Sequence, residues 1–394
     1  MVLVASAAIA TTTASGATLR QRLDRALTVQ GVSRPATGAV AINLRNGNAV
    51  YGLHGTLPLE PASNQKLTVA LAALDRLGPA YRVPTSVFGV GSRAGAVWQG
   101  RLVLKGYGDP SLNRADLRTL AERIRALGIR KVTGRIVGDE SYYDRRRTCT
   151  GWKASWYKIE SPPLSALVVS RAKVGQRTVD DPALAAAVGF KAALEARGVD
   201  VVGRARVGRT PAGSPRLTGV RSGPLSLLVR HMDKTSDNFY AEMLLKHLGA
   251  VKRGAGTSYQ GSLVVRTVLK QRGVPLRGVR IVDGSGLSVY DRLTARSLAA
   301  LLISAWSDAE LRAPFVASLP LAGVDGTLED RMESEPAYRT VRAKTGTTNT
   351  ASSLSGYAGS RYVFSILQNG RPIPWWYARR AQDRFAQILA GAAG

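Results

Sequence analysis

The chain has 394 residues, of which 45% are hydrophobic, with 41 glycines and 18 prolines. This length exceeds that of a typical single domain, and the composition is that of a globular, loop-rich protein. We therefore expect two domains and exclude a disordered or fibrous chain. Lys and Arg number 55 against 27 Asp and Glu, a formal charge of +28. The basic residues are spread along the chain, without zinc-finger spacing or a basic helix followed by heptads, so we expect no dedicated nucleic-acid binding and favour association with anionic polymers.

Few residues could hold a metal or a cofactor. Cys149 is the single cysteine, which excludes an intrachain disulfide. Because no histidine is near it in the sequence, we interpret it as an incidental thiol rather than a nucleophile. The histidines are scattered at His54, His231 and His247, so a zinc site with thiolate ligands is not expected. The sequence also has no phosphate-binding Gly-x-x-x-x-Gly-Lys-Ser/Thr loop. We expect neither metal nor cofactor.

Residues 1–17 are apolar, small and uncharged. They resemble the hydrophobic core and cleavage region of a secretion signal, although the positive residues that usually precede the core are missing. The segment is too short to span a bilayer, and no other window reaches 18 apolar residues. We expect an exported protein of the cell envelope or extracellular space, without a transmembrane span.

The elements expected next are a helix, a hairpin and a second helix. Leucines four residues apart predict a helix over 18–29, and Asn-Gly between two alternating segments predicts a hairpin of 39–44 with 49–51. Pro61 opens a helix that runs to Leu77, where Gly-Pro ends it.

The middle of the chain changes character. From Val83 to about Arg221, short strands alternate with helices, which indicates an inserted second domain; the strands are 85–90, 100–105 and 134–137, and the helices 115–127 and 183–196. The last third holds helical segments at 225–248 and 295–305, strands at 340–347, 353–357 and 361–367, and a final helix from Trp375. Strands from both termini around a helical middle predict one antiparallel sheet assembled from the two ends.

The run from Pro61 to Lys66 carries the most chemical information. Ser63 and Lys66 are three residues apart, so on a helix they lie on one face. A lysine with a lowered pKa can act there as the base that a serine nucleophile needs. Ser63 also lies in the first turn, where unpaired backbone N–H groups favour a developing oxyanion. Alone, however, such a tetrad is usually a helix cap followed by a solvated lysine.

Two further clusters would complete an acylating serine site. In Lys234–Asn238, the hydroxyl of Ser236 can relay a proton, and the amide of Asn238 can bind a substrate carbonyl or steady a lysine. In the second cluster, Lys344–Thr347, the lysine can lower the pKa of Lys66 and attract a substrate carboxylate.

The rest of the second cluster suits a ligand that lies against a strand. Gly346 lets the ligand approach closely. The backbone N–H of Thr347 could be a second oxyanion donor beside that of Ser63. Each cluster alone has an ordinary interpretation as a cap, a turn or a strand end.

Together, the three clusters stand in the order of the Ser-x-x-Lys, Ser-x-Asn and Lys-Thr-Gly set of the penicillin-binding proteins and serine β-lactamases. The surrounding segments resemble one branch of these proteins, the class C low-molecular-mass D-alanyl-D-alanine carboxypeptidases/endopeptidases of peptidase family S13. These segments are Gly108–Leu112, Gly138–Asp144, Pro163–Leu167, Lys234–Glu242, Asp283–Ser288 and Leu354–Tyr357.

The resemblance implies an α/β (α+β) architecture. Residues 18–82 and 222–394 would form a penicillin-binding-protein/β-lactamase-like transpeptidase domain, with an antiparallel sheet flanked by helices. Residues 83–221 would form an inserted α/β domain, shortened relative to the family. The implied substrates are peptidoglycan stem peptides ending in D-Ala-D-Ala, and β-lactam antibiotics would be covalent inhibitors.

The resemblance also implies roles for single residues. Ser63 attacks the carbonyl between the two D-alanines, and Lys66 takes its proton. Ser236 passes the proton to the leaving D-alanine, and Asn238 orients the substrate amide. Lys344, counted among the catalytic residues, and Thr345 hold the terminal carboxylate of the substrate. The residues counted as substrate-binding are Thr345, Gly346, Thr347 and Asp144. The N–H groups of Ser63 and Thr347 stabilise the oxyanion.

Three features depart from the family pattern. Ser236 follows Ser63 by only 173 positions, and the stretch 170–201 looks trimmed. Val289 stands where the family usually has an arginine, which predicts weaker selection for a charged third residue in the stem peptide. Thr348 stands where the family often has an apolar residue.

Other functions remain open at this stage. The nearest alternative is a serine β-lactamase or an esterase on the same fold, although no extra glutamate for fast deacylation is identifiable. A non-catalytic wall-binding module would not need the three clusters together. A Ser-His-Asp hydrolase would use His54, but no Gly-x-Ser-x-Gly surrounds Ser63. The balance between carboxypeptidase and endopeptidase activity is not predicted.

Overall fold

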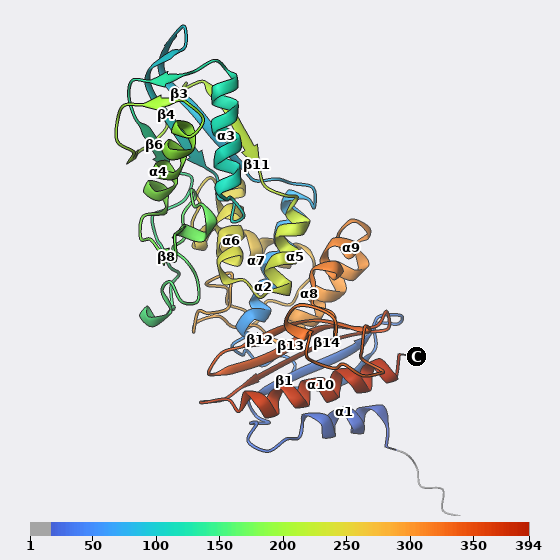
Figure 1. The fold of residues 1–394 in the computed structure, drawn as a ribbon. Helices are drawn as coiled ribbons and strands as arrows, with labels where there is room; N and C mark the ends of the chain where they lie inside the picture. Colours follow the sequence, from blue (N-terminus) through green and yellow to red (C-terminus); the bar gives the residue numbers. More distant parts are fainter. Residues whose placement is uncertain (1–16, 394) are drawn as a thin grey trace, which may run out of the picture.

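The computed structural model describes residues 17–393, so the prediction of a signal-like segment at 1–17 lies almost entirely outside the described residues. Figure 1 shows an elongated molecule with one sheet at each end and a group of helices between them. The two sheets come from different parts of the chain.

The first sheet joins the two ends of the chain. Its five strands are antiparallel, in the order β12-β13-β14-β1-β2. Strand β1 (Thr37–Asn43) pairs with β14 (Tyr362–Asn369) along its whole length and with β2 (Ala49–Leu53) on its other side. Strands β12 (Val341–Thr347) and β13 (Ala351–Ala358) complete the sheet. The expected antiparallel sheet assembled from both termini is confirmed.

Helices cover both faces of this sheet (Figure 1). On one face, α1 (Leu19–Leu27) and α10 (Trp375–Gly391) bury residues such as Phe385 against Tyr51 and Phe364. On the other face lies a helical layer with its own apolar core. It consists of α2 (Lys66–Leu77), α5 (Leu225–Lys234), α6 (Asn238–Arg253), α7 (Ser258–Gln271), α8 (Ala295–Ser307) and α9 (Ala309–Ser318).

The second sheet lies at the far end of the molecule and is mixed. Strand β3 pairs antiparallel with β4, which in turn pairs parallel with β6. A separate core, which includes Phe190, fills the space between this sheet and its helices. The elements are β3 (Pro84–Ala94), β4 (Val97–Gly106), α3 (Arg114–Ala126), β5 (Lys131–Val132), β6 (Ile136–Asp139), α4 (Pro182–Glu195), β9 (Asp200–Val201), β10 (Arg206–Val207) and β11 (Arg216–Arg221), with a small hairpin of β7 (Lys173–Val174) and β8 (Arg177–Thr178).

Two predicted helices have different boundaries in the structure. The expected single segment 225–248 is broken between α5 and α6, because Ser236 has a φ of 57° and Asp237 caps α6 by accepting the N–H of Tyr240. The helix expected from Pro61 begins with a 3₁₀ turn, η1 (Ala62–Gln65), before α2. Both breaks occur at residues that the sequence assigns to the site.

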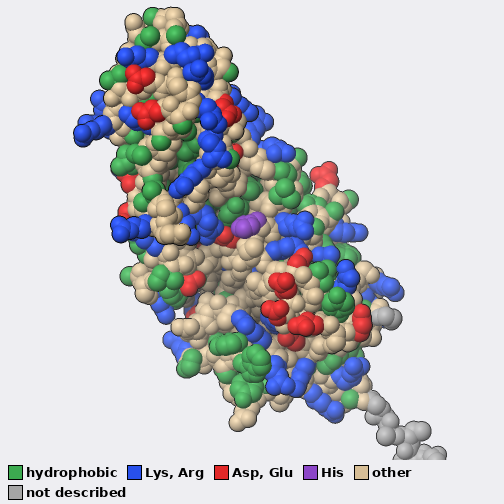
Figure 2. Space-filling view, viewed as in Figure 1, with side chains coloured by type: hydrophobic (Ala, Val, Ile, Leu, Met, Phe, Trp, Pro, Cys, Tyr) green, Lys and Arg blue, Asp and Glu red, His purple; other side chains and the backbone are tan. Residues whose placement is uncertain are grey.

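The spread of charged side chains and the hydropathy of the helices can be followed along the described residues. Lys and Arg are dispersed over the upper and lower parts of the face in Figure 2, with acidic side chains among them. In the part of the chain from residue 17 to 393, no helix is long and apolar enough to cross a membrane.

Candidate active site

The turn that carries Ser63 is clamped against the first sheet. Its neighbour Asn64 is buried and donates its Nδ2 to the carbonyl of Lys344 (3.1 Å) and to Oγ of Ser353 (2.8 Å). These bonds join η1 to strands β12 and β13. Ser63 is therefore held between the edge strand of the sheet and the start of α2.

The side chain of Lys66 is fully buried beside Ser63. Its Nζ donates to Oγ of Ser63 (2.9 Å), Oδ1 of Asn238 (2.8 Å) and the carbonyl of Ser285 (2.8 Å). The last two atoms can only accept hydrogen bonds, whereas the hydroxyl of Ser63 can also donate. When Lys66 loses a proton, its lone pair therefore faces the hydroxyl of Ser63, which is the arrangement that a general base requires.

Burial lowers the pKa of Lys66 to about 8, against the opposing effect of nearby carboxylates, chiefly that of Asp283. From the sequence, either burial or a nearby positive charge, that of Lys344, could lower this pKa. In the structure burial is the main cause, and it also lowers the pKa of Lys344, with a further contribution from the charge of Lys66. A pKa near 8 gives a useful fraction of neutral amine at neutral pH.

This pKa predicts a pH dependence. If neutral Lys66 is the base, acylation of Ser63 rises about tenfold per pH unit below the pKa and levels off above it. We expect the inflection near pH 8, well below the ordinary lysine value of 10.5. The second-order rate constant for acylation by penicillin, measured across this range, provides the test; an inflection near the ordinary lysine value would contradict it.

Lys344 lies on β12 and reaches the turn between α5 and α6. Its Nζ donates to Oγ of Ser236 (2.9 Å) and to the carbonyl of Thr345 (3.0 Å). Its side chain is buried, and the carboxyl of Asp233, itself buried, acts on its charge. The positive φ of Ser236 is the backbone conformation that brings this hydroxyl to the lysine. The second and third sequence clusters thus meet across the site.

Gly346 is required by close packing. A Cβ at this position would lie 2.2 Å from Oγ of Ser353, 2.9 Å from the backbone nitrogen of Ser63 and 3.0 Å from the carbonyl of Pro61. The strand can therefore approach η1 only because residue 346 lacks a side chain. Thr347 follows at the end of β12, and its hydroxyl accepts a bond from Nη2 of Arg379 (3.2 Å).

The loop Asp283–Ser288, to which the sequence assigned no chemical role, also contributes to the site. The N–H groups of Gly284 and Ser285 donate to Oε1 of Glu242 (2.9 and 2.8 Å), which holds the Ser285 carbonyl in place for Lys66. Gly286 has a φ of 83°, and a Cβ there would lie 1.9 Å from the carbonyl of Ala62. The glycines in the Asp283–Ser288 segment could have indicated this close approach. No residue type in the segment could have predicted that the Ser285 carbonyl accepts a hydrogen bond from Lys66.

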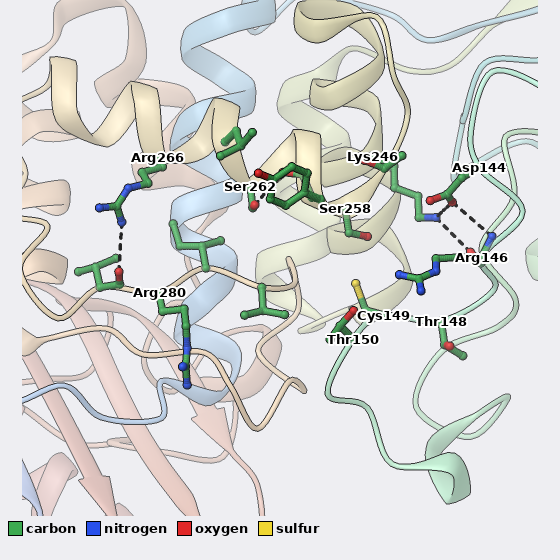
Figure 3. A pocket seen from close by; sticks show the side chains of 16 residues that line it. Asp144, Arg146, Thr148, Cys149, Thr150, Lys246, Ser258, Ser262, Arg266 and Arg280 are labelled. Atoms are coloured by element: carbon green, nitrogen blue, oxygen red, sulfur yellow. Dashed lines mark hydrogen bonds and ion pairs between the residues drawn. The ribbon is translucent and has the colours of Figure 1, made fainter.

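The structure does not place Asp144 with this cluster. Its carboxylate forms an ion pair with buried Lys246 in a separate pocket of 470 Å³, shown in Figure 3. Cys149 lies in the same pocket and donates its thiol to Oε2 of Glu242 (3.4 Å). Burial raises the pKa of this thiol, which fits an unreactive cysteine. Substrate binding by Asp144 stays a prediction.

A second pocket of 580 Å³ lies beside the nucleophile, with Ala62 and Gly286 in its wall. Val289 and Arg292 line it, and Nη1 of Arg292 donates to the carbonyl of Val289 (2.8 Å). Thr348 also lines it, and its hydroxyl accepts the N–H of Ala351 (3.0 Å) in the turn after β12. Val289 and Thr348, the two single positions that depart from the family pattern, thus line the same pocket.

A serine paired with a buried lysine, faced by a second hydroxyl–lysine pair on an antiparallel sheet, defines an acylating serine enzyme of the penicillin-binding-protein and β-lactamase type. The comparisons with known proteins agree. Residues 19–178 and 172–391 match the model of the D-Ala-D-Ala carboxypeptidase 3 (S13) family. The chain belongs to this family.

Curated relatives extend over most of the chain. The D-alanyl-D-alanine carboxypeptidase of Actinomadura sp. is 32% identical over 97% of this chain and 86% of its own length. Carboxypeptidase DacB of Mycolicibacterium smegmatis is 31% identical over 84% of this chain and 75% of its own length.

Solved structures share the fold. Penicillin-binding protein 4 of Haemophilus influenzae superposes with a TM-score of 0.82 at 22% identity, over 94% of this chain and 98% of its own. A predatory peptidoglycan endopeptidase of Bdellovibrio bacteriovorus gives a TM-score of 0.59 at 17% identity, over 91% and 92% of the two chains. The fold class expected from the resemblance is confirmed.

Proposed function

We infer that this protein is a serine-type D-Ala-D-Ala carboxypeptidase that acts through an acyl-enzyme at Ser63. The family and the named relatives support the activity. The observation that supports the mechanism is the set of three partners around Nζ of Lys66, which directs its lone pair at the hydroxyl of Ser63. No step requires a metal or a cofactor.

In the proposed first step, neutral Lys66 removes the proton of Ser63 while Oγ attacks the carbonyl between the two D-alanines. The developing oxyanion is stabilised by the N–H groups of Ser63 and Thr347. The C–N bond then breaks as Ser236, in contact with Lys344, relays the proton held by Lys66 to the nitrogen of the leaving D-alanine, which returns Lys66 to its neutral form. Water hydrolyses the ester and restores Ser63, and the same lysine acts as the base in this second half.

Binding of the substrate would use groups that are already in position. We assign the terminal carboxylate to Lys344 and Thr345, whose hydroxyl already donates to Oγ1 of Thr327 (2.7 Å). Nδ2 of Asn238 donates to the carbonyl of Glu160 (3.0 Å), and a substrate carbonyl would replace this partner. Gly346 keeps the strand open to an extended peptide.

We propose stem peptides of peptidoglycan as the substrates, β-lactams as covalent inhibitors and the cell envelope as the place of action. The support is family membership and the β-lactam complex of the related penicillin-binding protein 4. Residues 18–82 and 222–394 would be the catalytic domain and 83–221 the inserted domain. Their separate sheets support this division, although Leu164, Ala166 and Val168 of the inserted range pack into the core of the helical layer.

The side-chain preference of the substrate would depart from that of relatives with an arginine at position 289. In the pocket beside Ser63, the guanidinium of Arg292 is held by backbone carbonyls and lies 3.8 Å from Glu60, so its charge is partly engaged. We expect weaker selection for a free charged third residue, measured as D-Ala release from charged and acetylated peptides. An undiminished preference for the charged form would contradict this expectation.

The test of the function is release of D-alanine from a soluble D-Ala-D-Ala peptide, compared with turnover of nitrocefin. A carboxypeptidase releases D-alanine in many turnovers but hydrolyses nitrocefin in a stoichiometric burst. Rapid multiple turnover of nitrocefin without D-alanine release would favour the β-lactamase alternative. Digestion of cross-linked peptidoglycan distinguishes carboxypeptidase from endopeptidase activity. The comparison is needed because a peptidoglycan endopeptidase shares this fold.

A further inference from the structure

Three aromatic side chains are exposed in the first turn of α10. Trp375, Trp376 and Tyr377 are 47%, 59% and 48% exposed. The chain has six tryptophans, and these two are the only ones in the exposed class. Exposed apolar groups of this size usually mark an interaction site, and aromatic residues with arginine are enriched in such sites. We call Trp375, Trp376 and Tyr377 the aromatic patch.

The aromatic patch is connected to the catalytic strand. The guanidinium of Arg379 lies over the ring of Trp375 (4.6 Å) and donates to the hydroxyl of Thr347 (3.2 Å). Thr347 ends β12, the strand that carries Lys344. One arginine therefore contacts both the patch and the proposed oxyanion donor.

A second connection runs through the pocket beside Ser63. Arg371 and Pro372 line this pocket, and the N–H of Ile373 donates to the carbonyl of Asn349 (3.0 Å) in its wall. The chain then enters α10 and the aromatic patch. The pocket and the aromatic patch thus lie at the two ends of one short segment, residues 371–377.

From this continuity we propose that the aromatic patch binds the glycan strand of the peptidoglycan whose stem peptide occupies the Ser63 site. This proposal rests on the proposed function. The electron-rich faces of the indoles attract the partly positive C–H groups of a sugar ring. The exposed side chains of Arg371 and Arg380 suit the carboxylates of the attached peptides. Four extended residues span about 13 Å, and the contacts from Thr347 through Arg379 to Trp375 connect the two places that a stem peptide would have to link.

A membrane surface fits the helix less well. An interfacial helix needs a long apolar face that is free to enter the lipid. Beyond its first turn, the apolar side chains of α10 are buried against the sheet, including Phe385 and Leu389. Arg379 is also engaged by Thr347 and Trp375. Only one turn of aromatic side chains remains exposed, which suits contact with the C–H face of single sugar rings in a polymer.

The test uses the Ser63→Ala protein, so that binding is separated from digestion. Sedimentation with intact peptidoglycan is compared before and after Trp375→Ala and Trp376→Ala are added together. We expect binding to weaken about tenfold or more. The control is Tyr259→Ala, which removes an aromatic side chain of α7 that is more exposed (67%) than those of the patch. Adding peptide-free glycan strands should reduce the amount of Ser63→Ala protein that sediments with peptidoglycan.

Activity gives an independent readout. With Ser63 intact, the double tryptophan variant should lose activity on polymeric peptidoglycan but release D-alanine from a short soluble peptide at the normal rate. If the unaltered enzyme cleaves no soluble peptide, the proposed function fails while the binding assay still decides on the patch. Equal sedimentation of the double variant would overturn the proposal. So would patch-dependent binding to anionic phospholipid vesicles alone, or a patch-dependent dimer in ultracentrifugation.

Discussion

Lys66→Met is expected to reduce acylation of Ser63 by penicillin by a factor of about 10²–10⁴, the usual contribution of a general base. Methionine fills the buried volume but cannot accept the proton of Ser63. It also leaves Oδ1 of Asn238 and the carbonyl of Ser285 without their donor. Removing a buried ammonium partly offsets that loss in the free energy of unfolding, so we expect a folded protein.

The matched control is Lys246→Met, which removes another buried lysine, one that pairs with Asp144 rather than with Ser63. This variant should keep most of its acylation rate. Stopped-flow measurement of the rate at pH 8 compares the two, with thermal unfolding to show that both are folded. Equal acylation by Lys66→Met and the unaltered protein would remove the lysine from its proposed role.

Gly346→Ala is expected to have the second large effect. The new Cβ would lie within 3.0 Å of Ser353 Oγ, the nitrogen of Ser63 and the carbonyl of Pro61, and two of these are backbone atoms that cannot rotate away. The turn η1 must then shift from β12, and a displacement of about 1 Å at a reacting group can cost about 100-fold in rate. Overpacking should also lower the free energy of unfolding by about 1–3 kcal/mol.

Gly52→Ala is the control for this substitution. Gly52 also lies in a strand of the first sheet, β2, but nothing lies within 4 Å of the position that its Cβ would take. We expect this variant to acylate normally and to keep its melting temperature. If Gly346→Ala behaves like Gly52→Ala in the acylation assay, the contact between β12 and η1 is not needed for the reaction.

The sheet was predictable from the sequence because its signals are local. The alternating segments 39–44 and 49–51, with Asn-Gly between them, indicate the first hairpin from local sequence alone. Assembly of the sheet from both ends followed from the distribution of those strands. The register that pairs Ala41 with Phe364 was less predictable, because both faces of β1 and β14 are buried and no exposed face marks it.

The backbone of the site was less predictable. Helical periodicity continues through residues 225–248, so the pattern did not reveal the break at Ser236, where a positive φ serves the contact with Lys344. The contact of Lys66 with the Ser285 carbonyl joins positions 219 apart in the chain, and a backbone carbonyl leaves no mark in the sequence. The residue types were enough to predict Ser63 as nucleophile and Lys66 as base. They were not enough to predict the acceptors that direct the lone pair of Lys66.

The causes of the pKa shifts were also out of reach. A lysine three residues from a serine gives no measure of its own burial, and burial is what lowers the pKa of Lys66. Asp144 was predicted to bind substrate because it lies in a segment similar to the family. Its position in that segment did not show which way its side chain points. Its ion pair with Lys246 became visible only in three dimensions.

The central claim is that Ser63 is the acylated nucleophile, and the most direct measurement is the intact mass of the protein after incubation with penicillin. We predict one covalent adduct per chain, located by peptide mapping to the fragment with Ser63, and no adduct on the Ser63→Ala protein. The same adduct on Ser63→Ala, or a label mapped to another residue, would contradict the account.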